Sequence, residues 1–114
     1  PTIMGMAPVP AVKRLLERTG KKISDIGLWE LNEAFGSQAL ACLRELGIAQ
    51  NAPFDNVNIW GGALALGHPL EECGDRILVT LHSIMKNERK DVKYGVDSLC
   101  GAFGNGGATM LSRV

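Results

Sequence analysis

A glycine-flanked apolar run, Gly61-Gly62-Ala63-Leu64-Ala65-Leu66-Gly67, restricts the local fold more than any other segment, and it leads directly into His68 and Pro69. Glycine permits backbone angles and close approaches that a Cβ would block, and proline fixes its own φ and favours the first turn of a helix. The sequence therefore predicts a strand-to-helix turn that holds His68. An imidazole with an ordinary pKa of about 6.5 exchanges a proton near neutral pH. His68 is thus a candidate for proton chemistry, and packing within a buried turn is the alternative.

The composition indicates a single globular domain without a strong electrostatic preference. The 114 residues are 46% hydrophobic, and 12 basic side chains balance 12 acidic ones, so net charge gives no reason to expect nucleic acid or membrane partners. Apolar runs fall short of the roughly 20 residues that span a bilayer, and the first residues do not show the charged-then-apolar pattern of a secretory signal. We expect a cytoplasmic protein, with a mitochondrial or peroxisomal location left open. The odd number of cysteines without CxxC spacing predicts reduced thiols and no metal site: Cys42, Cys73 and Cys100.

The order of periodic and extended segments predicts an α/β fold. We expect helices over residues 9–18, 33–46 and 70–86, strands over 26–31, 57–59, 92–100 and 108–114, and a loop over 49–55. The glycine-rich connection over residues 101–107 is too short for a parallel crossover, so the last two strands should form an antiparallel hairpin. The sequence therefore predicts a layered α/β domain that ends in a hairpin.

Three polar residues come at the ends of predicted strands or in tight turns. Asn32 follows the first strand, His68 follows the glycine-flanked run, and Cys100 ends the strand before the hairpin. In layered α/β folds, such strand ends converge on ligand sites. Asparagine can hold a water or donate to an oxyanion, histidine can move a proton, and an accessible cysteine can act as acid, base or nucleophile. Together they indicate acyl or carbanion chemistry, with a helix N-cap as the alternative for Asn32 and a small buried apolar residue for Cys100.

Four ordered motifs resemble those of the thiolase family. They are Met4-Gly5-Met6-Ala7-Pro8-Val9-Pro10-Ala11, Asn32-Glu33-Ala34-Phe35, the run from Gly61 to Pro69, and Cys100 with its glycine-rich hairpin. The resemblance covers essentially the whole chain and corresponds to most of the C-terminal half of a thiolase subunit. It implies a thiolase-like C-terminal half-domain over residues 1–114, with a mixed sheet covered by helices on both faces. The resemblance also implies that the half-domain is incomplete at its N-terminus, where a further strand would pair within the sheet.

The resemblance implies acyl transfer between coenzyme A thioesters. Thiolases cleave a 3-ketoacyl-CoA with free CoA or run the reverse Claisen condensation, with CoA and acyl-CoA as substrates and without a metal or redox cofactor. In that family a cysteine from the N-terminal half is acylated. His68 matches the histidine that activates this thiol and helps form an oxyanion hole, and Asn32 matches the asparagine that positions a water there. Cys100 matches the cysteine that protonates or deprotonates the reacting carbon. The remaining matched positions are an oxyanion backbone N–H at Ala102 and the pantetheine channel at Ala34 and Phe35.

Two segments depart from the thiolase pattern. A small-residue segment usually follows the Gly-His-Pro motif, but this chain has three carboxylates there, at Glu71, Glu72 and Asp75, and Cys73 where serine or threonine is common. Unpaired carboxylates would be costly in a tightly packed interior. The hairpin reads Cys-Gly-Ala-Phe-Gly-Asn-Gly instead of a pattern like Cys-x-Gly-Gly-Gly-x-Gly. We interpret three other residues as structural: Trp60, His82 and Cys42.

Three functions follow from these patterns. The first is the C-terminal portion of an acetyl-CoA acetyltransferase or a 3-ketoacyl-CoA thiolase, with Asn32, His68 and Cys100 in working roles. It requires a complementary N-terminal half from the same subunit or another chain, within a homodimer or homotetramer. The second is a non-catalytic thiolase-like subunit or interaction module in which the Glu71-Glu72 turn has displaced acyl-CoA binding. The third, a ketoacyl synthase relative, is disfavoured because the Asn32–Phe35 motif and the late Cys100 belong to the thiolase pattern.

Overall fold

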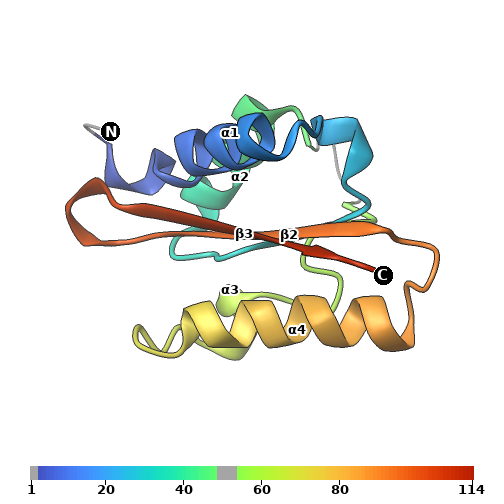
Figure 1. Ribbon diagram of the computed structural model, residues 1–114. Coiled ribbons are helices and arrows are strands. Elements are labelled where there is room, and N and C mark those ends of the chain that lie inside the picture. The colour runs from blue at the N-terminus through green and yellow to red at the C-terminus, as the bar shows by residue number, and fades with distance from the viewer. Residues whose placement is uncertain (1–2, 49–53) are drawn as a thin grey trace.

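A three-stranded mixed sheet forms the centre of the computed structural model, which describes residues 3–48 and 54–114 (Figure 1). Strand β1 (Leu28–Leu31) pairs in parallel with β2 (Tyr94–Cys100), and β2 pairs antiparallel with β3 (Gly106–Ser112). The predicted mixed sheet and its C-terminal hairpin are confirmed. Because β1 and β2 are hydrogen-bonded neighbours, a further strand would have to join at a sheet edge or separate these two.

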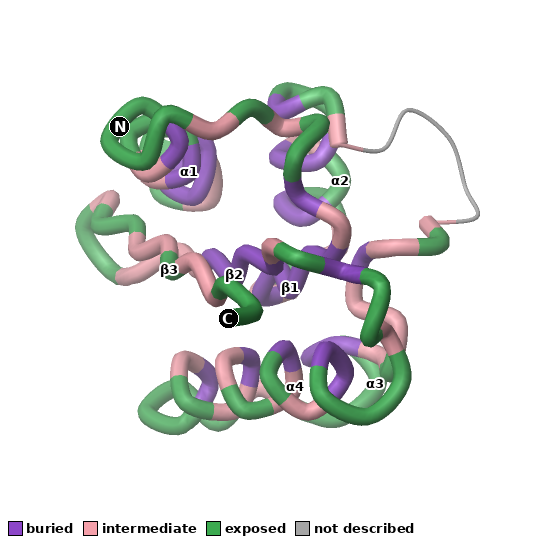
Figure 2. Tube along the Cα trace, turned by 45° about the vertical axis from the view of Figure 1, so that its right-hand side comes forward, coloured by how far each residue is buried: buried purple, intermediate pink, exposed green. Residues whose placement is uncertain are grey.

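Helices cover both faces of this sheet, as expected (Figures 1 and 2). Helices α1 (Pro8–Thr19) and α2 (Gly36–Leu46) lie on one face, while α4 (Cys73–Asn87) and the single turn α3 (Ala63–Leu66) lie on the other. Three short 3₁₀ turns complete the described elements: η1 (Met4–Met6), η2 (Ile23–Asp25) and η3 (Ala102–Gly104). The chain therefore forms a three-layer α/β arrangement around its sheet.

Alternation along the strands creates two apolar cores, one on each face of the sheet. Trp29, Leu31 and Val96 pack with α1 and α2, whereas Leu28 packs with Leu81 and Ile84 of α4. Successive side chains of a strand point to opposite faces, so β1 and β3 contribute apolar side chains to both cores, whereas β2 contributes them to the core beneath α1 and α2. No helix in the described ranges combines the length and apolarity needed to cross a membrane.

The start of α2 differs from the prediction. Asn32 does not cap this helix, which begins four residues later at Gly36 with Phe35 at the N-cap position. The backbone N–H of Asn32 instead donates to the carbonyl of Ser98 at 2.9 Å, which extends the contact between β1 and β2. Sheet pairing therefore keeps Asn32 beside β2, and the helix starts only after the chain has left the sheet.

The segment around the glycine-flanked run also differs from the prediction. The expected strand over 57–59 is reduced to one parallel bridge between Trp29 and Val57, and the run itself contains α3. Pro69 does not start a helix directly. Its carbonyl accepts from the N–H groups of Glu72 and Cys73 in a turn that precedes α4. Most of the loop predicted over 49–55 lies outside the described residues.

Candidate active site

All six residues that the sequence singled out for the site line one pocket of about 390 Å³. They are Asn32, Ala34, Phe35, His68, Cys100 and Ala102. Five other residues complete the lining: Met4, Leu70, Cys73, Leu99 and Gly101. The structure thus brings together three separate segments, namely the end of β1, the connection between α3 and α4, and the end of β2 with the hairpin that follows.

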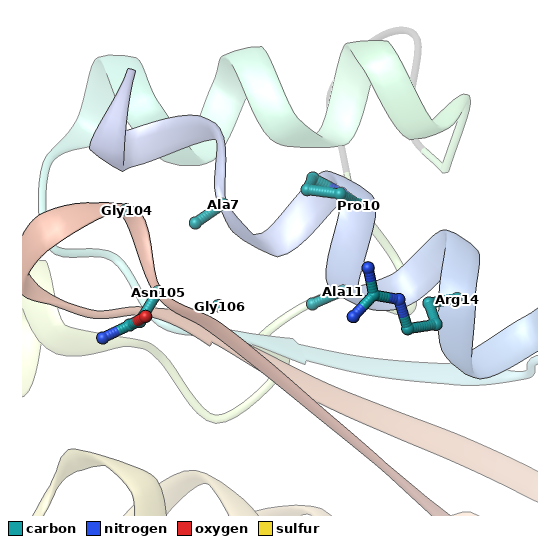
Figure 3. Close-up of a pocket in the computed structure, with 7 residues that line it drawn as sticks. All are labelled: Ala7, Pro10, Ala11, Arg14, Gly104, Asn105 and Gly106. Atoms are coloured by element: carbon teal, nitrogen blue, oxygen red, sulfur yellow. The ribbon is translucent and has the colours of Figure 1, made fainter. Parts of the chain in front are cut away.

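A second pocket, of about 490 Å³, lies between the start of α1 and the hairpin (Figure 3). Its lining includes Ala7, Arg14 and Asn105, and none of the six predicted site residues contributes to it. Arg14 is the charged side chain among the residues that line it. We therefore build the candidate active site on the pocket that contains His68.

Parallel pairing of β1 with β2 places Asn32 and Cys100 at the same edge of the sheet. Leu31 is the register partner of Ser98, and the carboxyl ends of both strands open toward the pocket. Asn32 is 1% exposed, and its side-chain Oδ1 has no hydrogen-bond partner in the described part of the chain. Buried polar atoms are normally satisfied, so an unpartnered amide oxygen at a pocket wall is suited to hold a water or a substrate donor.

His68 lies in the connection between α3 and α4, and a sulfur atom contacts its ring. Its Nδ1 is 2.7 Å from Sγ of Cys73, the first residue of α4, which is buried. A neutral imidazole engaged at Nδ1 can still exchange a proton through its other ring nitrogen, Nε2. The sequence identified Cys73 only as a departure from the family pattern. Its spacing of five residues from His68, across a turn that begins with proline, is the signal that could have predicted this contact.

Glu33 ties the glycine-flanked run to the end of β1. One carboxylate oxygen accepts from Nδ2 of Asn58 at 2.9 Å, and the other accepts from the backbone N–H of Leu64 at 3.0 Å. A Cβ on Gly62 would lie 2.3 Å from this carboxylate. Only glycine therefore lets the backbone at residue 62 come this close to Glu33. The sequence placed Glu33 in the first turn of a helix, which is wrong.

The side chain of Asn58 bonds to the backbone of β1 in the segment where the sequence predicted a strand over residues 57–59. Its Oδ1 accepts from the N–H of Leu31 at 2.8 Å, and its Nδ2 donates to the carbonyl of Leu31 at 2.9 Å. Asn58 has a φ of 47°, a left-handed conformation that asparagine tolerates better than most residues. Sequence reasoning missed both Glu33 and Asn58 as site-supporting residues, because their partners are distant in the chain.

The hairpin holds Cys100 and Ala102 in a tight connection. The N–H of Gly101 donates to the carbonyl of Asn105 at 2.7 Å, which closes the turn around η3. Phe103 has a φ of 60° and a fully exposed side chain, so it occupies a left-handed position where the family pattern expects glycine. Cys100 itself is half-buried at the end of β2.

The acidic residues that depart from the family pattern lie on the surface. Glu71, Glu72 and Asp75 are all exposed, and none of them lines the pocket around His68. Their charges therefore avoid the desolvation cost expected for a packed interior. This arrangement leaves the pocket free of the acidic turn.

The residues interpreted as structural lie outside the site pocket. Trp60 is 44% exposed and its Nε1 donates to Glu88 at 3.0 Å, so this ring is anchored at the surface by a hydrogen bond. His82 is exposed on α4. Cys42 is fully buried, and its Sγ contacts the carbonyl of Gly5 at 3.2 Å. Burial raises the pKa of the Cys42 thiol above its ordinary value, which favours the inert protonated form.

Comparisons with known proteins identify the family of this chain. The family model described as "Thiolase, C-terminal domain" matches residues 1–113. The chain is 52% identical over its whole length to a 3-ketoacyl-CoA thiolase of Yersinia enterocolitica, 50% to one of Pectobacterium carotovorum and 47% to one of Escherichia coli. It spans 29% of the length of each of these relatives. The chain belongs to the thiolase family.

Proposed function

We propose that this chain supplies the His68, Cys100 and Asn32 part of a thiolase active site and takes part in CoA-dependent acyl transfer. The observation that carries the proposal is the convergence of these three side chains, from three separate segments, on one pocket. The substrates would be a 3-ketoacyl-CoA and free CoA, or two acyl-CoA molecules in the reverse Claisen direction. The name of these relatives, 3-ketoacyl-CoA thiolase, supports this substrate class.

The proposed reaction divides the proton transfers between His68 and Cys100. His68 takes the proton of a cysteine thiol on a complementary N-terminal half, and that sulfur attacks the 3-keto carbon. The carbon–carbon bond then breaks, and the acetyl-CoA enolate that leaves takes a proton from Cys100. Cys100 next takes the proton of a CoA thiol, whose sulfur attacks the acyl-enzyme thioester. The shortened acyl-CoA is released, and the cysteine thiolate that leaves takes its proton back from His68. A cysteine suits this role because its ordinary pKa of about 8.5 lies close to the operating pH.

Two oxyanions need stabilisation along this path. Nε2 of His68 and a water held by Oδ1 of Asn32 would face the oxyanion of one thioester, and the backbone N–H of Ala102 would face the other. Preorganised donors of this kind typically contribute on the order of 10²–10³ in rate. Ala34 and Phe35 would line the channel for pantetheine. No metal or redox cofactor takes part in the proposed steps.

The proposal includes a partner for this chain. A complementary half, in the same subunit or another chain, would carry the acylated cysteine, and the completed subunits would assemble as homodimers or homotetramers. The share of the relatives' length that the chain spans, 29%, supports this requirement. The 114-residue chain alone should therefore show no thiolysis when the loss of 3-ketoacyl-CoA absorbance is followed with added CoA. Activity that rises with purification of the chain alone would contradict the requirement.

Substitutions in the completed protein test the residue roles. We expect His68→Ala and Cys100→Ala each to lower kcat/KM by a factor on the order of 10² to 10⁴, because each removes a proton-transfer group. The assay is the same loss of 3-ketoacyl-CoA absorbance. His82→Ala and Cys42→Ala are the matched controls, since both side chains lie outside the pocket. Near-normal turnover by Cys100→Ala, with its identity verified, would refute the assigned role.

A further inference from the structure

The contact between His68 and Cys73 links a residue of the proposed mechanism to one with no assigned role. Sγ of Cys73 lies 2.7 Å from Nδ1 of His68, and both residues line the same pocket as Cys100. Cys73 is 1% exposed and begins α4, so the sulfur is held by a buried helix end. The imidazole, in contrast, lies in the irregular connection between α3 and α4.

The chemistry of His68 depends on what its Nδ1 contacts. A neutral imidazole has one N–H donor and one acceptor nitrogen, and the partner of one nitrogen sets the state of the other. When the Cys73 thiol donates to Nδ1, Nε2 carries the hydrogen and can donate to an oxyanion. When Nδ1–H donates to the sulfur, Nε2 is bare and can accept a proton. A thiol is both a weak donor and a weak acceptor, so the contact can persist in both states.

We propose that Cys73 is a positioning residue for His68, holding the ring with Nε2 directed toward the reacting acyl group while the proton moves. The inference rests on the proposed function, since it concerns the same site. It assigns no nucleophilic role to Cys73. Among the described residues, the His68 ring makes no other side-chain hydrogen bond, so the orientation of the ring depends on this contact.

Two substitutions separate a hydrogen-bonding role from packing. Cys73→Ser keeps a donor and an acceptor on the same Cβ, whereas Cys73→Ala keeps only the Cβ. We expect Cys73→Ala to lower kcat/KM of the completed enzyme about 10-fold or more, and Cys73→Ser to retain activity within about threefold, as expected for a proton-transfer group that loses its orientation. Equal losses in the two variants would overturn the proposal, because the hydrogen bond would then not be what matters.

A spectroscopic readout tests the contact without any turnover. The chain has two histidines, His68 and His82, so ¹⁵N-histidine labelling gives two sets of ring signals, and exposed His82 serves as an internal reference. At about pH 8, where an ordinary imidazole is neutral, we expect the Nδ1 signal of His68 to differ from that of His82. Cys73→Ala should move the His68 signal by several ppm toward the His82 value, and Cys73→Ser should move it much less.

The two readouts separate failure of this inference from failure of the proposed function. If wild-type His68 already shows the signal of a free imidazole, or if Cys73→Ala leaves its Nδ1 signal unchanged, the positioning role is wrong whatever the activity. If the signals respond as expected and His68→Ala retains full turnover, the proposed function is wrong instead. The wild-type spectrum needs no substitution, so the test also holds if Cys73→Ala fails to fold.

Discussion

Glu33 joins two segments that are about thirty residues apart in the sequence. Its two oxygens accept from different partners, the side chain of Asn58 and the backbone of Leu64, with separations of 25 and 31 residues. These bonds fix the start of α3, which leads to His68. A carboxylate suits this position because it can accept from both donors at once.

Glu33→Gln should therefore loosen the connection that carries His68. A glutamine amide keeps one acceptor oxygen and replaces the other with a donor, so one of the two hydrogen bonds is lost. We expect a decrease in kcat/KM of about 10-fold, consistent with misplacement of a catalytic group, and faster hydrogen exchange at the amide of Leu64.

A surface carboxylate provides the control for this substitution. Glu45 is exposed on α2 and contacts Lys13 at 3.4 Å, so Glu45→Gln should change neither activity nor exchange at Leu64. Unchanged exchange at Leu64 in Glu33→Gln would show that the carboxylate does not hold the run.

The chemistry of individual residues is predictable from the sequence to a large extent. His68, Asn32 and Cys100 stand out by residue type and by their place beside glycine, proline or predicted strand ends. The roles of Glu33 and Cys73 are not predictable in the same way. A carboxylate or a thiol has many possible partners, and only the folded chain selects among them.

At the scale of elements, the hairpin between β2 and β3 contains a conformation that its sequence does not favour. Phe103 lies in η3 with a φ of 60° and a ψ of 23°, within the left-handed region. This region costs a residue with a Cβ roughly 1–2 kcal/mol relative to the right-handed one. Since the side chain is fully exposed, no buried contact of the ring offsets that cost in the described structure.

Phe103→Gly should stabilise the hairpin relative to Phe103→Ala. Both substitutions remove the exposed ring, but only glycine relieves the left-handed strain, and part of that gain is offset by its greater freedom in the unfolded chain. We expect the glycine variant to be more stable by about 1 kcal/mol in denaturant unfolding. Equal stabilities of the two variants would show that residue 103 is not held in the left-handed conformation.

The sequence predicts helices correctly where the apolar periodicity is strong, and its errors lie mainly at the ends of elements. The helices over α1 and α4 follow from apolar spacing, whereas α2 begins later than predicted because Asn32 stays bound to Ser98 across the sheet. The strand predicted over 57–59 is also changed by hydrogen bonds to the sheet, and only one bridge forms there. The backbone of Asn56 and Asn58 bonds to Trp29 of β1, but at Leu31 the side chain of Asn58 makes the hydrogen bonds that a longer strand would have made with its backbone.

At the scale of the whole molecule, two carboxyl groups are buried between the sheet and α4. Glu30 of β1 and Asp97 of β2 are register partners, and they are 1% and 3% exposed. Burial raises the pKa of Glu30 to about 8, against the opposing effect of Arg76 and with smaller contributions from Glu33 and Asp97. Burial also raises the pKa of Asp97 to about 6, opposed by a hydrogen bond from Thr109.

These raised pKa values make the folded state bind protons more tightly than the unfolded state. For Asp97 the stabilising contribution is complete below the ordinary pKa of 3.8 and is lost as pH rises through about 6. For Glu30 the corresponding window runs from 4.5 to about 8. Between about pH 4 and pH 8, the two groups together should lower the free energy of unfolding as pH increases.

Asp97→Asn should remove part of this pH dependence. The amide cannot ionise, so we expect little change in stability near pH 4 and a gain on the order of 2 to 3 kcal/mol near pH 8. The measurement is denaturant unfolding at several pH values, with exposed Asp55→Asn as the control. A gain of the same size at both pH values would contradict titration of Asp97 as its cause.

The sequence by itself determined the α/β class and the C-terminal hairpin, and it predicted residues that line one pocket. These properties depend on residue type, local backbone preference and the spacing of apolar side chains, all of which are local. Only the tertiary structure decided that Asn32 bonds to Ser98 across the sheet instead of capping a helix, that Glu33 holds the run before His68, and that Cys73 contacts the imidazole. Those contacts form because parallel pairing of β1 with β2 and the burial of α4 bring distant segments together, and their geometry depends on the whole packed chain.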